Sequence, residues 1–179
     1  MKDLARHQRA LLALLRRGTP PDPEDDPYLH RVAASPDLAE ARGNILFWRI
    51  YVLERTCVLT VALLRGRRTL TATLHDFIAG HNLSPFREFQ PRAFLAWLSV
   101  SGDPVLAAVA SFEMALTAVR EGDTTAYEVH WPVDPHLVLD ALTRGSPLTE
   151  PLPQTAWVAR VCHAIPGGFS LDPSGNAGT

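Results

Sequence analysis

The sequence predicts a mainly α, α+β fold, in which a helical bundle precedes a small C-terminal strand-helix-strand module. Apolar residues recur at helical spacing through most of the first 120 residues. A strand-like alternation of apolar and polar side chains then follows at Tyr127, Glu128, Val129, His130 and Trp131. The pair Asp134-Pro135 restarts a helix, because aspartate is a good N-cap and proline suits the first helical turn.

Changes in composition divide the chain into five parts. Prolines interleaved with acidic residues after Pro20 oppose helix formation and predict an exposed linker. The expected parts are an amphipathic helix (1–19), an acidic proline-rich linker with a short segment (20–34), a helical body (35–122), a β/α module (123–166) and a flexible tail (167–179).

Four helix starts share one local signal, a capping residue followed by proline, at Ser35-Pro36, Ser84-Pro85, Asp103-Pro104 and Asp134-Pro135. The first of these begins a long helix that we expect to run from Ser35 to about Leu64 and to end at Gly66. The next helix closes near Gly80.

The C-terminal module contains two predicted strands, at 125–131 and 155–163. Between them we predict a helix over 135–142, which Gly145 can terminate. Two strands alone are marginally stable, so we expect this module to pack on the helical body or on a partner.

Bulk composition excludes several classes of protein. The net charge is −2, with 46% hydrophobic and 20% charged residues, which argues against a general affinity for nucleic acid. The longest apolar region is interrupted by Arg49, Glu54 and Arg55, so we expect no membrane span. Cys57 and Cys162 do not suggest a disulfide framework, which favours a reducing, cytoplasmic location.

No catalytic or metal-binding residue is assigned from the sequence. His75, Asp76 and His81 form the nearest histidine cluster, but their spacing matches no metal-ligand motif, and a solvated helix end explains them better. Neither a phosphate-binding glycine loop nor an activated nucleophile is recognisable, although a site assembled from distant residues stays open.

A basic cluster at Arg65, Arg67 and Arg68 permits contact with phosphates. A helix end whose dipole is complemented by cations explains it more simply, because no aromatic platform accompanies it. The basic residues nevertheless keep one alternative open, a nucleic-acid-binding regulator with a winged-helix-like C-terminal module.

The central part of the long helix carries a candidate protein interface at Trp48, Arg49, Tyr51 and Arg55. Aromatic and arginine side chains are enriched at interfaces, and residues 48, 51, 52 and 55 share one helical face. The other interpretation is that Trp48 packs in the bundle while the arginines pair with carboxylates. Glu113, at the margin of an apolar helix stripe, raises the same choice between an internal partner and an interface.

The predicted strand from Tyr127 to Trp131 also has two interpretations, a core strand and an exposed edge. An exposed edge offers unpaired main-chain donors and acceptors to an extended peptide.

Four segments together resemble the partner proteins of multinuclear non-heme iron oxidases, which act in ribosomal peptide biosynthesis, including the methanobactin and thiaglutamate pathway subunits. The segments are RGNILFWRIYVLERTCVLTVALL, SPFREFQPRAFLAWL, FEMAL and WPVDPHLVLDAL. The resemblance spans most of the chain from about Ser35 to Pro166 and consists of general similarity, without an invariant catalytic signature.

The resemblance implies a non-catalytic partner subunit with no cofactor of its own, while iron belongs to a separate oxidase. It further implies that this chain helps to present a cysteine-containing precursor peptide to that oxidase. We therefore expect the precursor leader to add a strand to the C-terminal sheet near Tyr127, Glu128, Val129, His130, Trp131, Val158 and Arg160. We expect the helical body to dock to the oxidase through Trp48, Arg49, Tyr51 and Arg55.

Overall fold

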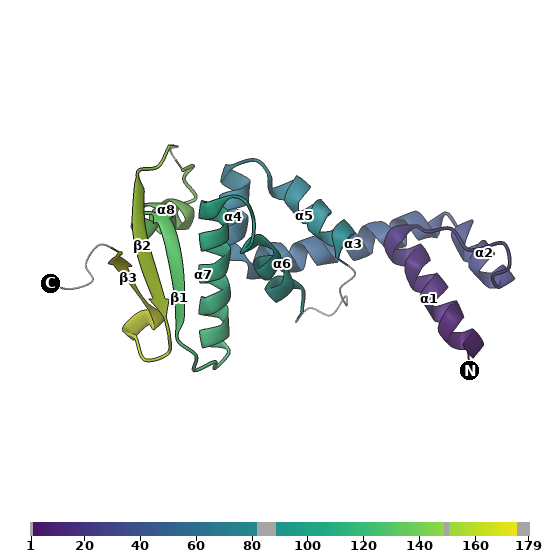
Figure 1. Cartoon of the computed structure of the whole chain (residues 1–179). Coiled ribbons are helices and arrows are strands. Elements are labelled where there is room, and N and C mark those ends of the chain that lie inside the picture. The colour runs from purple at the N-terminus through teal and green to yellow at the C-terminus, as the bar shows by residue number, and fades with distance from the viewer. Residues whose placement is uncertain (1, 82–88, 149–150, 175–179) are drawn as a thin grey trace.

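An elongated run of helices leads to a small sheet at the C-terminal end of the molecule (Figure 1). The structure is a computed structural model, and it describes residues 2–81, 89–148 and 151–174. Within these ranges, helices dominate and a three-stranded antiparallel sheet follows them, which confirms the predicted mainly α, α+β class. None of the described helices is both long enough and apolar enough to cross a membrane.

The elements follow one another in a simple order. The helices are α1 (Lys2–Arg17), α2 (Pro27–Ala33), α3 (Asp37–Thr56), α4 (Val58–Gly66), α5 (Leu70–Gly80), α6 (Gln90–Leu98), α7 (Pro104–Arg120) and α8 (Pro135–Arg144). The strands are β1 (Tyr127–Val133), β2 (Gln154–Val161) and β3 (Phe169–Pro173), with a short 3₁₀ turn at Pro166–Gly168 before β3.

Capping contacts explain where the predicted helices begin. The Asp103 carboxylate accepts hydrogen bonds from the N–H groups of Val105 and Leu106, both at 3.0 Å, and Asp134 accepts from the N–H of His136 at 2.8 Å. Gly145 ends α8 in the left-handed conformation, at φ 65°, as predicted. The predicted start at 84–85 lies outside the described residues.

The linker predicted over 20–34 contains a helix that we did not expect. Asp26 accepts a hydrogen bond from the N–H of Tyr28 at 2.7 Å, and Pro27 occupies the first turn of α2. This is the same Asp-Pro signal that starts α7 and α8. The surrounding prolines obscured the signal in the sequence.

The single long helix predicted from Ser35 to Leu64 is wrong, because the chain breaks at Cys57 into α3 and α4. Cys57 has φ −97° and ψ 60°, which is outside the helical region. The break frees the first N–H groups of α4, and the carboxylate of Glu113 on α7 accepts hydrogen bonds from two of them. The tertiary contact with Glu113 therefore stabilises a helix boundary that the local sequence does not mark.

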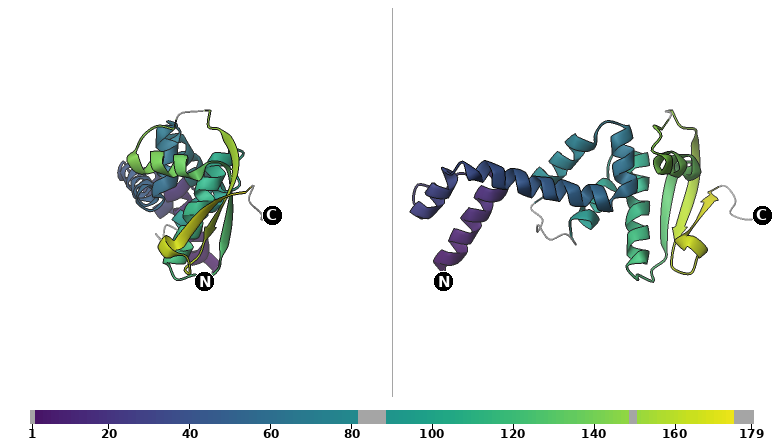
Figure 2. Two further views of the ribbon diagram at one scale, coloured as in Figure 1. Left: turned by 90° about the vertical axis from the view of Figure 1, so that its left-hand side faces the viewer. Right: turned by 180° about the vertical axis from the view of Figure 1, so that it is seen from behind.

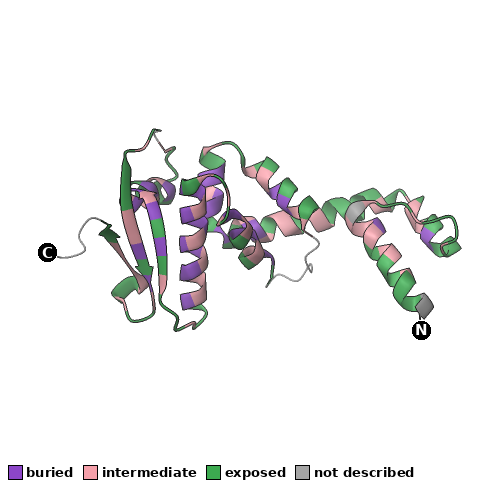
Figure 3. Ribbon diagram, in the orientation of Figure 1, coloured by how far each residue is buried: buried purple, intermediate pink, exposed green. Residues whose placement is uncertain are grey.

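Helix α7 lies between the sheet and helices α4 and α6 and is buried along most of its length (Figure 3). It packs against α4 and α6 and against β1 and β2. One continuous core joins the helical body to the sheet and includes Leu53, Phe94, Phe112, Trp131 and Val161. The C-terminal module therefore shares its core with the helical body.

The flexible tail predicted over 167–179 needs a correction, because Phe169–Pro173 forms β3 and completes an antiparallel sheet of order β1-β2-β3. Phe169 packs edge-on against Phe112 on α7, with ring centroids 5.2 Å apart. Phe169 and Leu171 are too few to produce a clear alternating pattern in the sequence, and their burial comes from the tertiary contact.

Candidate functional site

Strand β1 lies at one margin of the sheet, because in the order β1-β2-β3 it pairs with β2 alone among the described strands. Its register places Val129 opposite Ala159 and His130 opposite Val158. In the left view of Figure 2 the strands lie nearer to the viewer than α7 and the helices that precede it. The predicted candidate strand is thus an edge strand, and β3 forms the other edge.

Two main-chain hydrogen bonds determine which side of β2 faces β3. The N–H of Ser174 donates to the carbonyl of Ala156 at 2.8 Å, and the N–H of Cys162 donates to the carbonyl of Gly168 at 3.0 Å. In an antiparallel ladder, residues that bond to one neighbour alternate with residues that bond to the other. The even-numbered residues of β2 therefore pair with β3, and the odd-numbered residues pair with β1.

The same alternation orients the main chain of β1. The main-chain N–H and C=O groups of Ala159 and Trp157 point toward β1. Their partners Val129 and Trp131 therefore form the hydrogen-bonded pairs with β2. The N–H and C=O groups of Glu128 and His130 consequently point toward the free edge. These are the groups that an added strand would use.

Pro132 limits this edge. The main chain of Pro132 faces the free edge, as that of Glu128 and His130 does, but proline has no N–H to donate. Pro132 also coincides with the register shift between Trp131 and Val133. Proline within a sheet is expected at such an edge or bulge position. The segment available for pairing therefore ends at Trp131.

The side chains of the predicted peptide-binding residues divide between two faces of the sheet. Val129 and Trp131 are buried against the helical body, and the ring of Trp131 lies 5.7 Å from that of Phe112. They form part of the core, so their side chains are not available to a bound peptide. Tyr127, on the same face, is half-buried and donates its hydroxyl to Asp123 at 2.6 Å.

The outer face of the sheet carries the other predicted residues. Glu128 and His130 are exposed, and Val158 and Arg160 lie opposite them on β2. Arg160 donates from Nε to Glu128 at 3.2 Å, and both side chains are more than half exposed. The structure therefore brings together Glu128, His130, Val158 and Arg160 as one accessible surface beside the free edge.

A hydrogen-bonded turn fixes the start of β1. The Asp123 carboxylate accepts hydrogen bonds from the N–H of Thr125 at 2.8 Å and from the hydroxyl of Tyr127. Hydrogen bonds from Thr125, followed by that from Tyr127, lower the pKa of Asp123 to about 2. The turn thus orders the main chain just before the exposed edge.

Helix α3 exposes three aromatic side chains, Phe47, Trp48 and Tyr51, which we call the aromatic patch. Their exposed fractions are 58%, 56% and 41%. The rings contact one another, with centroids of Trp48 and Tyr51 5.5 Å apart, and the guanidinium of Arg55 lies 5.8 Å from the Tyr51 ring. Three large exposed rings on one helix face are typical of a protein interface.

Arg49 does not belong to the aromatic patch. It is half-buried, and its Nε donates to Oε1 of Gln90 on α6 at 2.9 Å. Arg49 also lines a cleft of about 880 Å³ between α1, α3 and α5. The sequence placed Arg49 with Trp48 because the two are adjacent, but one residue turns a helix by about 100°.

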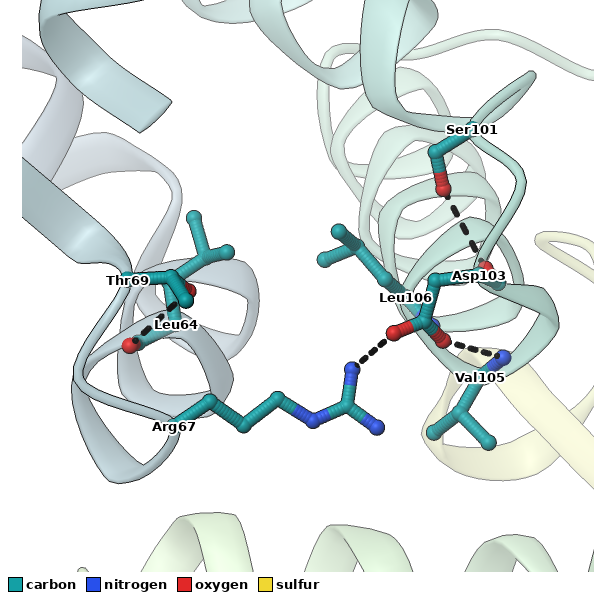
Figure 4. A network of polar contacts seen from close by, with 7 residues as sticks. All are labelled: Leu64, Arg67, Thr69, Ser101, Asp103, Val105 and Leu106. Carbon is teal, nitrogen blue, oxygen red and sulfur yellow. Dashed lines mark hydrogen bonds and ion pairs between the residues drawn. The ribbon is translucent and has the colours of Figure 1, made fainter. Parts of the chain in front are cut away.

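The basic cluster near residue 67 is partly neutralised inside the fold. Arg65 pairs with Glu54 at 3.2 Å, and Arg67 pairs with Asp103. Figure 4 shows Asp103 joining this ion pair to the N–H of Val105, so the contact ties the end of α4 to the start of α7. Such contacts give these two arginines a structural role.

Of the histidine cluster noted in the sequence, His81 packs against aromatic rings, whereas His75 and Asp76 are exposed. The His81 ring contacts Phe77 and Trp97, with centroid distances of 4.7 and 5.7 Å. In the part of the chain that the structure describes, no three His, Cys, Asp or Glu side chains gather in a way that could hold a metal ion.

No protein-family model matches this chain, and neither the curated proteins nor the solved structures compared with it include a significant match.

Proposed function

We propose that this chain is a non-catalytic partner subunit of a multinuclear non-heme iron oxidase, which it binds in the cytoplasm while presenting a cysteine-containing ribosomal precursor peptide. The observation that carries the proposal is the free edge of β1. There the main-chain groups of Glu128 and His130 are available for pairing beside an exposed, mixed polar surface.

Strand addition at this edge suits a leader peptide. Main-chain hydrogen bonds supply affinity that depends little on sequence, while Glu128, His130, Val158 and Arg160 can contact alternate side chains and set the register. Because Pro132 ends the edge, the leader pairs with the segment from Tyr127 to Trp131.

The aromatic patch on α3 supplies the second surface of the proposal. Phe47, Trp48 and Tyr51 are exposed on the helical body, whereas the peptide edge lies in the C-terminal sheet (Figure 1). Two separate surfaces allow one chain to hold an oxidase and a peptide at the same time. Holding both raises the effective concentration of the precursor cysteine at the oxidase.

The first experiment tests the complex as a whole. The chain is co-expressed with a candidate iron oxidase, purified, and assayed for modification of a cysteine-bearing precursor. We expect a stable complex that contains iron and a reaction that needs both proteins. Full activity of the oxidase without this chain, or failure of the two proteins to associate, contradicts the proposal.

A pair of variants at His130 tests the edge itself. His130→Pro removes an outward N–H, whereas His130→Ala removes the side chain and keeps that N–H. We expect the proline variant to bind the leader at least about tenfold more weakly than the alanine variant, because it loses a main-chain pair. Equal leader binding by the two variants rules out strand addition at β1.

Trp48→Ala separates the two surfaces. It should weaken binding to the oxidase by about 2 kcal/mol or more if Trp48 is an interface anchor, and it should leave leader binding unchanged. Leu12→Ala, which shortens another exposed apolar side chain on α1, is the control. The expected order is contradicted if both variants bind the oxidase as the unmodified chain does.

A further inference from the structure

The cleft between α1, α3 and α5 gathers positive charge. Its cationic side chains are Arg16 from α1 and Arg42 and Arg49 from α3. The imidazoles of His75 on α5 and of His81, just after α5, also line it. No acidic side chain lines the cleft among the described residues. Cationic side chains on the wall of a cleft attract an anion.

Arg49 provides an independent indication of a missing partner. Its Nε bonds to Gln90, but its Nη2 is buried and has no hydrogen-bond partner among the described residues. Burial, followed by repulsion from Arg16, lowers the pKa of Arg49. A buried guanidinium nitrogen without an acceptor is costly, and an oxyanion is the acceptor that fits it best.

The walls of the cleft are mainly apolar. Leu15, Ile45, Leu46 and Ile78 line it together with the cationic groups. A volume of about 880 Å³ is far more than a lone phosphate ion needs and lies within the range of pockets that hold small organic ligands. The ligand should therefore have an apolar portion as well as a negative group.

Gly18 permits the close approach of α1 to α3 at this cleft. A Cβ atom at Gly18 would lie 2.5 Å from Nη1 of Arg42, and Gly18 also has φ +67°. The left-handed backbone conformation favours glycine at this position. The Arg42 guanidinium thus lies next to the end of α1, beside the cleft.

We propose that this cleft binds an organic anion whose carboxylate or phosphate group contacts Arg42 and Arg49 and whose apolar portion contacts Leu46 and Ile78. Guanidinium groups match both kinds of oxyanion in a bidentate geometry. The inference does not depend on the partner-subunit function, because it rests on a different surface and a different set of side chains.

The test measures binding of hexanoate, hexyl phosphate, inorganic phosphate and hexylammonium to the full chain by titration with NMR detection. We expect hexanoate or hexyl phosphate to bind more tightly than inorganic phosphate, and hexylammonium not to bind. The better of the first two identifies the head group. No saturable binding of either up to about 10 mM overturns the proposal, as does tightest binding by hexylammonium. Binding by inorganic phosphate alone also overturns it, because the apolar portion would then have no role.

Variants locate the site. Arg49→Gln and Arg42→Gln should each weaken binding of the better probe about tenfold or more, because each removes a charge-assisted hydrogen bond. Arg55→Gln, on the exposed aromatic side of α3, should bind as the unmodified chain does. Arg42 is exposed, so its replacement tests the site even if Arg49→Gln disturbs the contact with Gln90. Unchanged binding by both cleft variants places the anion elsewhere and overturns the assignment.

Discussion

The carboxylate of Glu113 accepts a hydrogen bond from the main-chain N–H of Thr60 at 2.9 Å, although the two residues are 53 positions apart in the sequence. Its other oxygen accepts from the N–H of Leu59 at 2.8 Å. An acidic side chain from α7 therefore caps the first turn of α4 and favours negative charge at the positive end of that helix. This contact explains how α3 and α4 can separate at Cys57 inside an apolar core.

We predict that Glu113→Ala lowers the free energy of unfolding by roughly 2–4 kcal/mol, because it leaves two N–H groups of α4 without an acceptor in a buried place. The measurement is urea denaturation followed by circular dichroism. Glu121→Ala, an exposed glutamate just after α7, should change the same free energy by less than about 0.5 kcal/mol. Equal effects of the two substitutions contradict a capping role for Glu113.

The ionisation of Glu113 should make stability depend on pH. Burial raises the pKa of Glu113 above its ordinary value of 4.5, and hydrogen bonds from Thr60 and Leu59 oppose this shift only in part. The folded chain therefore holds the proton more tightly than the unfolded chain, and the contribution of Glu113 to stability decreases as pH rises from 4.5 through the raised pKa.

The isosteric variant Glu113→Gln has no such titration. The stability of the unmodified chain, measured relative to this variant by urea denaturation at several pH values, should fall as pH rises above 4.5. A difference that stays constant or increases with pH shows that the folded carboxyl has an ordinary or lowered pKa.

The outcome for Glu113 illustrates what the sequence could and could not predict. Periodicity and Asp-Pro or glycine signals are local, so they correctly predicted α7, α8 and the fold class. The break at Cys57 depends on a side chain from another helix, and no local pattern reveals it. Glu113 was correctly noted as a candidate for an internal partner, but its partner is main chain, which periodicity cannot identify.

The candidate surfaces divide in the same way. Alternation correctly indicated that Glu128 and His130 share one face of a strand, but which edge is free depends on β3, which was missed. Trp48 and Tyr51 are exposed together. Their exposure agrees with the interface interpretation and not with packing of Trp48 inside the bundle. The cleft was not predicted, because Arg16, Arg42 and Arg49 become neighbours only when α1 packs on α3.

The two free cysteines should differ in reactivity. Cys57 is completely buried, and burial, assisted by the nearby Glu113, raises the pKa of its thiol. Cys162 is only half-buried. Iodoacetamide should therefore alkylate Cys162 in the folded chain and leave Cys57 unmodified, as measured by peptide mass spectrometry. In denaturant both cysteines should react. If Cys57 in the folded chain is modified at the same rate as Cys162, the α3–α4 junction opens readily and the prediction is wrong.

Proline substitutions test the main-chain pattern from which the free edge was inferred. The N–H of His130 points away from β2, whereas the N–H of Ser170 on β3 points toward β2. His130→Pro should therefore keep the sheet, while Ser170→Pro loses a ladder hydrogen bond and places its ring against β2. We expect Ser170→Pro to be less stable than His130→Pro by at least about 1 kcal/mol in urea denaturation. The alanine variants at the same positions correct for the lost side chains. If His130→Pro is the less stable of the two after that correction, its N–H is paired within the sheet, and β1 cannot accept an added strand at His130.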